Sequence, residues 1–303
     1  MDTVAKGTRK TRTRSSTPER GESGPVAGTF PIDTGTCELV RDQYSDDSWI
    51  IQINGVPSSH VNVADPTVLD FEYMRWIAHL VDSERDKAER LRVLHLGGGA
   101  CSMARYFAAT YPDARQVVVE IDGALAELVR DWFDLPRAPL LRIRVGEARA
   151  VTETLTESTR DIVIRDVFAG STTPTPLTTA QFTTHVRRVL APGGIYIVNC
   201  GDTPDLQGAR SEAATIGAQF EHMAIIADPA MLKGRRYGNM IIAGSDVPIG
   251  GQPALARELL GGGVPAHVWQ DAEVRKFAKT EQKRYSPPKT LSTTAFARRV
   301  MRR

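Results

Sequence analysis

The feature that most constrains the fold is a regular alternation of apolar and amphipathic segments that begins near Leu91. The apolar segments are "LRVLHLG", "QVVVEID", "LRIRVGE", "DIVIRDVF", "GGIYIVNCG", "HMAIIADP" and "NMIIAGS". Helical patterns separate most of them, over residues 102–110, 124–133, 178–190 and 206–220. Continuous apolar strands that alternate with such helices indicate a mostly parallel sheet covered on both faces.

The last two apolar segments are joined by a loop containing "KGRRYG" rather than by a helix, which predicts a hairpin. That ending is typical of the seven-stranded AdoMet-dependent methyltransferase variant of the Rossmann fold, so we expect an α/β protein of this class. Upstream, "SWIIQINGVPSSHVNV" holds two β-rich runs around Asn54 and Gly55, which favours a tight hairpin turn. The segment that follows has apolar residues at helical spacing from Leu69 to Leu80.

These patterns divide the chain into four parts. We expect a disordered basic tail over residues 1–30 and an N-terminal β-hairpin with one helix over 31–89. A Rossmann-like nucleoside-binding domain should cover 90–248. Beyond it the chain becomes rich in Gly and Pro and then basic, which predicts a partly ordered tail over 249–303.

The charge is unevenly distributed along the chain. Residues 1–22 carry six Lys/Arg and three Asp/Glu, a net of +3, and residues 275–303 carry ten and one, a net of +9. Because the whole chain carries +2, the middle carries −10. Basic arms on an acidic body are compatible with nucleic-acid or membrane contact, but their composition favours plain solubility or disorder. The acidic body suits a cationic substrate.

Three cysteines, Cys37, Cys101 and Cys200, are widely spaced and form no metal-ligand pattern. They are read as free thiols, which favours a cytoplasmic protein with no metal site. The N-terminus has no apolar segment typical of a secretory signal. No apolar run approaches the ~18 residues that a membrane span needs.

A nucleoside site is predicted at the ends of the first three strands of the alternating region. Gly97, Gly98 and Gly99 lie at a strand-to-helix turn, where a Cβ would keep a ligand away from the backbone. The second strand ends in Glu120, about twenty residues after the glycines. A carboxylate at this place can accept hydrogen bonds from both ribose hydroxyls. The third ends near Glu147, where an acid commonly meets the adenine amino group. The neighbouring residues that we also expect to bind the nucleoside are Ile121 and Ala148.

This triple spacing favours an adenosine thioether, because "GGGACS" does not match the G-x-G-x-x-G order of NAD sites. A tight turn made only for packing is the simpler alternative. Asp166 ends the fourth strand, at the edge where ligands bind in open parallel sheets. It is a candidate catalytic residue, and its alternative role is that of a helix cap or loop-bonding Asp.

At these residues the chain resembles the spermidine synthase (polyamine aminopropyltransferase) family. The resemblance lies in "LGGG", "VEID", "VGEA", "IVIRDVFAG" and "LAPGGIYIVN". "INGVPSSH" and "FEYMRWIAH" look like the family's entrance hairpin and first helix. "NGVPSSHV" and "KGRRYGN" resemble the spermidine-synthase-like proteins of actinobacteria. The resemblance covers roughly residues 38–245.

The resemblance implies a transferase in which an amine attacks the carbon beside the sulfonium of decarboxylated AdoMet and releases methylthioadenosine. Asp166 matches the family's proposed proton acceptor, and Tyr73 matches its pocket tyrosine. His60, in the entrance hairpin, is a second candidate substrate-binding residue. The family also implies a small-molecule amine acceptor, no metal, and a homodimer.

Several positions depart from the family pattern. Ala100 replaces an Asp that binds the aminopropyl ammonium and repels the carboxylate of ordinary AdoMet. Ala169 replaces the second Asp of the fourth-strand motif, and Met74 and Arg75 replace a His and an acid. These losses predict weak binding of putrescine in the family's usual pose. A methyltransferase that uses AdoMet, or a non-catalytic nucleoside-binding homologue, therefore stays open beside aminopropyl transfer.

Overall fold

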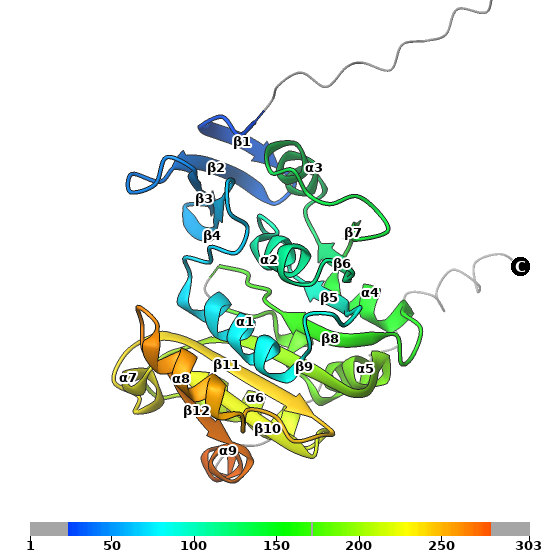
Figure 1. Ribbon diagram of the computed structural model, residues 1–303, viewed down its shortest axis with the longest axis vertical. Helices are drawn as coiled ribbons and strands as arrows, with labels where there is room; N and C mark the ends of the chain where they lie inside the picture. The colour runs from blue at the N-terminus through cyan, green and yellow to red at the C-terminus, as the bar shows by residue number, and fades with distance from the viewer. Residues whose placement is uncertain (1–23, 171, 280–303) are drawn as a thin grey trace, which may run out of the picture.

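The computed structural model describes residues 24–170 and 172–279; expectations about residues 1–23 and 280–303 lie outside the described part. The described chain forms two sheets and the helices that pack on them (Figure 1). In chain order the elements are β1 (Gly28–Ile32), β2 (Gly35–Arg41), β3 (Ser48–Ile53), β4 (Val56–Asn62), α1 (Glu72–Glu84), β5 (Arg92–Leu96), α2 (Ser102–Thr110), β6 (Arg115–Glu120), α3 (Gly123–Trp132), β7 (Leu141–Val145), α4 (Ala148–Thr154), β8 (Arg160–Arg165), the 3₁₀ helix η1 (Thr175–Leu177), α5 (Ala180–Val189), β9 (Leu190–Asp202), α6 (Gln207–Gly217), β10 (His222–Ala227), α7 (Pro229–Leu232), β11 (Gly238–Ser245), α8 (Pro253–Gly261), β12 (His267–Gln270) and α9 (Asp271–Ala278).

The larger sheet has the strand order β12-β10-β11-β9-β8-β5-β6-β7. The strands from β9 to β7 run parallel, and β11, β10 and β12 add antiparallel pairs at one end. The order reverses between β5 and β8, because the chain moves outward from β5 to β7 and then returns to β8. Ligands bind at the carboxyl ends of strands at such a switch point. The expected α/β class and mostly parallel sheet are confirmed.

One strand and two helices lie beyond the seven strands that the sequence predicted. β12 pairs antiparallel with β10, from Ala224 opposite Gln270 to Ala227 opposite His267. α8 and α9 bury Leu255, Leu259, Val274 and Phe277 in the main hydrophobic core. Residues 253–278 therefore belong to the globular body, whereas the sequence assigned them to a tail. The Gly- and Pro-rich segments around short elements hid this structure.

The smaller sheet is an antiparallel meander of β1 to β4. Asn54 and Gly55 both have positive φ, 51° and 79°, as a tight two-residue hairpin turn requires. The hairpin predicted at this pair is therefore confirmed. β1 begins at Gly28, so the N-terminal unit starts slightly before the predicted boundary at residue 31.

The smaller sheet is held over the glycine-turn end of the larger one. A second hydrophobic cluster joins Leu39, Trp49 and Ile51 of the small sheet to Ala104 of α2 and Val129 of α3. Polar contacts add to it at the start of α3. Asp122 accepts hydrogen bonds from the backbone and hydroxyl of Thr34, and Asp33 accepts from Gly123 and Ala124. This docking fixes where the hairpin lies relative to the cavity described below.

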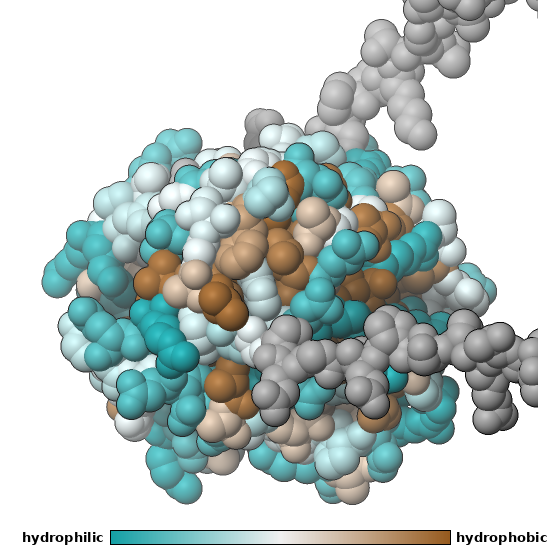
Figure 2. Space-filling view, turned by 90° about the horizontal axis from the view of Figure 1, so that it is seen from above, coloured by the Kyte–Doolittle hydropathy of each residue, from teal (hydrophilic) through white to brown (hydrophobic). Residues whose placement is uncertain are grey.

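The helices cover the large sheet on its two faces. In Figure 1, α1 and α8 lie in front of the sheet and α6 lies behind it. Figure 2 shows a mostly hydrophilic surface on which apolar residues gather near the centre of one face. In the described part of the chain, no helix combines the length and apolarity that crossing a membrane requires.

Candidate active site

A cavity of about 1200 Å³ opens at the carboxyl ends of the parallel strands, between the two sheets. It is lined by most of the residues that the sequence singled out: Tyr73, Gly97, Gly98, Gly99, Glu120, Ile121, Glu147, Ala148 and Asp166. These residues come from α1 and from the ends of β5, β6, β7 and β8. The topology thus brings together groups that are far apart along the chain.

In the glycine turn after β5, neighbouring atoms leave no room for a side chain at two of the glycines. At Gly97, φ is +91° and a Cβ would lie 2.1 Å from the carbonyl oxygen of Asp166. At Gly99, φ is +46° and a Cβ would lie 2.6 Å from Oγ of Ser59. Both positions therefore require glycine, on grounds of conformation and of space. Ser59 belongs to β4, so the small sheet forms one wall of the turn.

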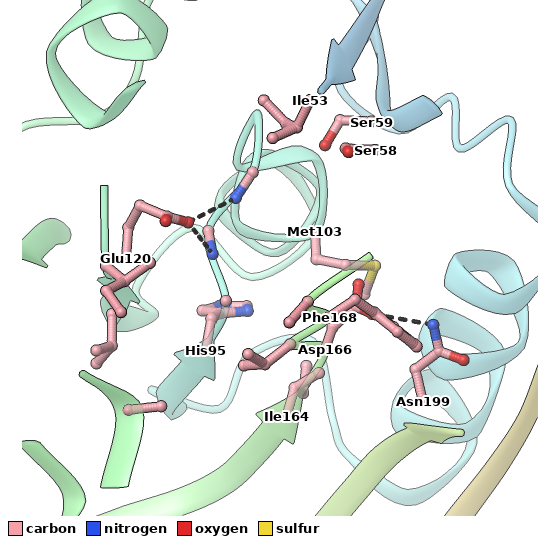
Figure 3. A pocket seen from close by; sticks show the side chains of 18 of the residues that line it. Ile53, Ser58, Ser59, His95, Met103, Glu120, Ile164, Asp166, Phe168 and Asn199 are labelled. Atoms are coloured by element: carbon pink, nitrogen blue, oxygen red, sulfur yellow. Dashed lines mark hydrogen bonds between the residues drawn. The ribbon is translucent and has the colours of Figure 1, made fainter. Parts of the chain in front are cut away.

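The carboxylate of Glu120 accepts hydrogen bonds from the backbone of the glycine turn. Its Oε2 accepts hydrogen bonds from the N–H groups of Gly98 (2.9 Å) and Gly99 (3.1 Å), as Figure 3 shows. Its Oε1 accepts from the N–H of Asp122 at 3.0 Å. A carboxylate has about four lone-pair positions, so acceptor capacity remains for a ligand in the cavity.

Glu147 is the N-cap of α4. Its two oxygens accept from the N–H groups of Arg149 (2.8 Å) and Ala150 (2.7 Å). This carboxylate therefore holds a helix start beside the cavity, where the helix dipole also favours negative charge. The sequence left helix capping open as an alternative role for Asp166. In the structure the Asp166 carboxylate accepts from two side chains, whereas Glu147 caps α4.

Asp166 lies at the opposite side of the cavity from Glu120, and Figure 3 shows both side chains. Its Oδ2 accepts from the hydroxyl of Tyr73 and its Oδ1 from Nδ2 of Asn199, each at 2.9 Å. Burial raises the pKa of the Asp166 carboxyl, while these two hydrogen bonds and the charge of Arg165 oppose that shift. The net shift is upward, so this carboxyl binds a proton at higher pH than a solvent-exposed aspartate does.

A buried ion pair supports the strand that carries Asp166. Arg165 and Glu212 are 1% and 4% exposed, and Nη2 of the arginine lies 2.7 Å from Oε1 of the glutamate. Arg165 also donates to the carbonyl of Leu177 at 2.6 Å. Removing one partner of such a pair leaves an uncompensated buried charge, so the two depend on each other.

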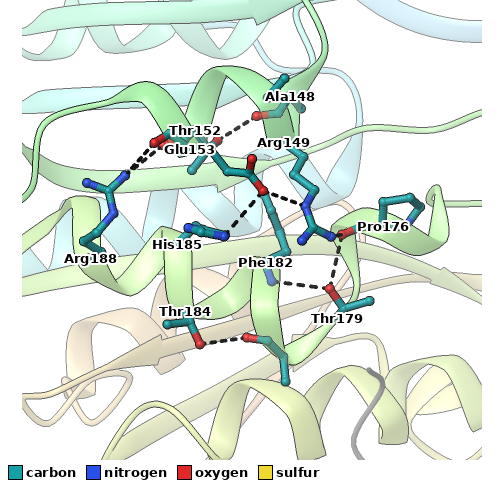
Figure 4. Close-up of polar contacts among 12 residues, drawn as sticks. Ala148, Arg149, Thr152, Glu153, Pro176, Thr179, Phe182, Thr184, His185 and Arg188 are labelled. Atoms are coloured by element: carbon teal, nitrogen blue, oxygen red, sulfur yellow. Dashed lines mark hydrogen bonds and ion pairs between the residues drawn. The ribbon is translucent and has the colours of Figure 1, made fainter. Parts of the chain in front are cut away.

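A second arginine, Arg149, donates a hydrogen bond to the carbonyl of Pro176, the residue before Leu177. Arg149 donates to the carbonyl of Pro176 at 3.2 Å and to Glu153 at 2.9 Å, and His185 lies 3.4 Å from the same carboxylate (Figure 4). Pro176 and Leu177 both line the cavity. Two arginines from different elements therefore fix this part of its wall.

A comparison with known proteins identifies the family. The model for the spermine/spermidine synthase domain matches residues 70–244, more than half of the chain. The chain belongs to the spermine/spermidine synthase family. It is 52% identical to a probable spermidine synthase from Corynebacterium glutamicum ATCC 13032, with a TM-score of 0.84. That match covers 88% of this chain and 99% of the other.

More distant relatives agree on family and fold. The chain is 31% identical over 129 residues to a probable polyamine aminopropyl transferase from Bifidobacterium longum. That match covers 42% of this chain but only 28% of the relative's length. The spermidine synthase from Thermotoga maritima is 14% identical, with a TM-score of 0.58, over 84% of this chain and 87% of that one. This last likeness concerns the fold alone.

The structure places His60 outside the cavity, which differs from the prediction that it binds substrate. His60 is 5% exposed, does not line the cavity, and its Nε2 lies 2.9 Å from Oδ2 of Asp42. The cause is strand geometry, because successive side chains of β4 point to opposite faces. Ser59 faces the glycine turn, where its Oγ accepts from the N–H of Ala100 at 3.0 Å, and His60 faces away.

The positions that depart from the synthase pattern have varied surroundings. Ala100 is fully buried under the hairpin and does not line the cavity. Arg75 donates to the carbonyls of Leu69 and Asp70. Met74 and Ala169 do line the cavity. The side chains at these two positions are uncharged.

Sequence reasoning missed several lining residues. The most important is Asn199, which is 1% exposed and orients Asp166 from the neighbouring strand β9. A polar residue inside the apolar run "YIVNC" was the available signal. Phe168 and Met103 also line the cavity, and nothing in their local patterns indicated it.

Proposed function

We propose that this protein is a transferase that moves the aminopropyl group of decarboxylated AdoMet to an amine acceptor. Its family supports this assignment, as do its similarities to a probable spermidine synthase from Corynebacterium and a probable polyamine aminopropyl transferase from Bifidobacterium. The observation that carries it is Asp166. This carboxyl lies at the switch point of the sheet, faces the glycine turn and is held by two side-chain donors.

The nucleoside would occupy the glycine-turn side of the cavity. The remaining lone pairs of Glu120 would accept the ribose hydroxyls, and Glu147 would lie on the adenine side with Ile121 and Ala148. The amides of Gly98 and Gly99 already bond Glu120, so the carboxylate is fixed before the ligand arrives. A prepared acceptor lowers the entropic cost of binding.

Asp166 would act on the amine. An alkyl ammonium has a pKa above about 10, so it reaches the site protonated and must lose a proton before it can attack. Asp166 takes that proton, and the nitrogen lone pair attacks the carbon bonded to the sulfonium sulfur. The new C–N bond forms as the C–S bond breaks. The electrons of the broken bond pass to sulfur, giving neutral methylthioadenosine and a secondary ammonium product.

The surroundings of Asp166 favour this role. Burial destabilises the charged carboxylate, raises its pKa and so reduces the free-energy cost of moving a proton from the ammonium. Tyr73 and Asn199 hold its two oxygens in place. A positioned base of this kind contributes about 10²–10⁴-fold to a rate.

Two measurements on the full chain test the proposal. Calorimetry with methylthioadenosine, AdoMet and decarboxylated AdoMet should give micromolar binding of methylthioadenosine. Incubation with decarboxylated AdoMet and an amine should release methylthioadenosine, followed by chromatography. If none of the three nucleosides binds, the proposal fails. Methyl transfer from AdoMet without aminopropyl transfer would replace it with a methyltransferase.

A further inference from the structure

We propose that His95 binds the ammonium group of the donor through the lone pair of its Nδ1 atom. The proposal rests on the proposed function and assigns a residue to one group of decarboxylated AdoMet. His95 belongs to β5 and lies two residues before the glycine turn. It is 4% exposed, and its ring lines the cavity. A buried imidazole in a central strand needs a polar partner for each of its two nitrogens.

The strand register places His95 between the two carboxylates of the cavity. β5 lies between β6 and β8, and His95 pairs with Val118 on one side and with Ile164 on the other. Glu120 and Asp166 stand two residues beyond these partners, and all four side chains line the cavity. Figure 3 shows the ring of His95 between the side chains of the two acids. A group bound to this ring is therefore flanked by two carboxylates.

One ring nitrogen already has a partner, and this contact fixes the tautomer. Nε2 of His95 lies 2.8 Å from Oε1 of Gln116, whose Nε2 donates to the carbonyl of Ala104 at 2.9 Å. Because a carbonyl oxygen can only accept, the amide of Gln116 must turn its own oxygen toward the histidine. Nε2 of His95 therefore carries the ring proton, and Nδ1 holds a lone pair.

The lone pair of Nδ1 is available to a ligand. Nδ1 has no hydrogen-bond partner among residues 24–170 and 172–279, and the ring that carries it lines the cavity. Burial lowers the pKa of His95 to about 4, so the imidazole is neutral at pH 7 and the lone pair stays free. The floor of the cavity thus offers a hydrogen-bond acceptor between two aliphatic side chains, those of Val118 and Ile164.

The ammonium of the donor is the group that suits this acceptor. With its ribose at Glu120 and its reacting carbon toward Asp166, the donor would have its sulfonium over β5. A sulfonium carries no N–H or O–H and cannot donate. The propyl arm on that sulfur ends in an ammonium, which has three N–H donors. Bound to Nδ1, this ammonium would also lie in the field of both carboxylates, which offsets the cost of burying its charge.

Two adenosine thioethers isolate this contact, one with an aminopropyl group on sulfur and one with a propyl group. They share the nucleoside, the sulfur and the three-carbon arm, and they differ in the ammonium. In calorimetry with the full chain, the aminopropyl ligand should bind at least about tenfold more tightly, because a hydrogen bond to a charged group contributes about that factor.

A pair of variants assigns the preference to His95. His95→Leu removes the acceptor and resembles the aliphatic residues beside it. The preference for the aminopropyl ligand should fall to about twofold or less, while the Kd of the propyl ligand changes less than about twofold. His95→Asn keeps an oxygen close to the place of Nδ1 and should retain most of the preference.

The outcomes separate this inference from the proposed function. If methylthioadenosine and both thioethers fail to bind the unmodified protein, the proposed function fails and this inference fails with it. If they bind without preference for the ammonium, the inference alone is overturned. An unchanged preference in His95→Leu also overturns it, because the ammonium is then bound elsewhere. Equal weakening of both ligands overturns it as well, because His95 then only shapes the cavity.

A measurement on the unmodified protein does not depend on the folding of a variant. The nitrogen NMR resonance of Nδ1 of His95 should move upfield when the aminopropyl ligand binds, because its lone pair then accepts a hydrogen bond. The propyl ligand should cause a smaller change, and Nε2 should stay protonated in both complexes. The same Nδ1 resonance position in the two complexes would contradict the assignment.

Discussion

The two sides of the cavity use carboxylates in different ways. On the nucleoside side, the oxygens of Glu120 and Glu147 accept from backbone N–H groups and thereby shape a turn and a helix start. On the other side, the hydrogen bonds that the Asp166 carboxylate accepts from described residues come from the side chains of Tyr73 and Asn199. Backbone amides hold those two carboxylates in place, whereas burial raises the pKa of the Asp166 carboxyl. The first arrangement suits binding and the second suits proton transfer.

Replacement of Asp166 should have the largest effect. Asp166→Asn removes the proton acceptor while keeping the size and much of the polarity of the side chain. Turnover, followed as methylthioadenosine release, should fall about 10²–10⁴-fold. Unchanged turnover would refute the role assigned to Asp166. Glu127→Ala, an exposed change on α3, serves as the control and should keep full activity.

The buried ion pair of Arg165 and Glu212 should contribute strongly to the free energy of unfolding. Arg165→Met leaves Glu212 buried without its partner and should lower the free energy of unfolding by about 3–5 kcal/mol, measured by urea titration. Adding Glu212→Leu removes the second charge and should restore part of the loss. The exposed pair of Arg187 and Asp246 is the matched control, and Arg187→Ala should cost less than about 1 kcal/mol. Equal losses at the two sites would contradict the importance of burial.

Replacement of Glu120 should affect binding more than chemistry. Glu120→Ala removes the acceptor for two glycine amides and for the proposed ribose hydroxyls. Hydrogen bonds to a charged group contribute about 1.5–3 kcal/mol, so the Kd for methylthioadenosine should rise about 10- to 150-fold in calorimetry. The rate at saturating nucleoside should change much less. A fall in that rate as large as the one expected for Asp166→Asn would erase the distinction between the two sides.

The smallest predicted effect is a shift in pH dependence. The hydrogen bond from Tyr73 lowers the pKa of Asp166, so Tyr73→Phe should raise it further. Because Asp166 must be ionised to accept a proton, the acid limb of the kcat/KM profile should move to higher pH. A shift to lower pH would show that the tyrosine hydroxyl does not stabilise the carboxylate. Tyr44→Phe, on an exposed side chain, should leave the profile in place.

Much of this division between the two sides was visible in the sequence. The alternating apolar segments predicted the parallel sheet, and Gly97, Glu120 and Asp166 stood at strand ends that a parallel sheet brings together. The sequence could not show which groups each carboxylate accepts hydrogen bonds from. Which acid caps a helix depends on loop geometry, so capping was weighed for Asp166 and is found at Glu147.

Other features depend on tertiary contacts that no local pattern carries. His60 lies one position from Ser59, and the pleat of β4 sends only one of them to the glycine turn. Phe168 and Tyr237 both come close to Gly201 because β8, β9 and β11 are neighbours in the sheet. The α8–α9 segment combines short elements with Gly-rich connections, and its apolar residues are too few for a clear period.

The independence of the two sides is tested most directly by titrating methylthioadenosine into Asp166→Asn and Glu120→Ala side by side with the unmodified protein. Asp166→Asn should bind within about twofold of the unmodified protein, because it keeps every group that holds the glycine turn. Glu120→Ala should bind at least about tenfold more weakly. If Asp166→Asn weakens binding as much as Glu120→Ala does, the division into a binding side and a reacting side is contradicted.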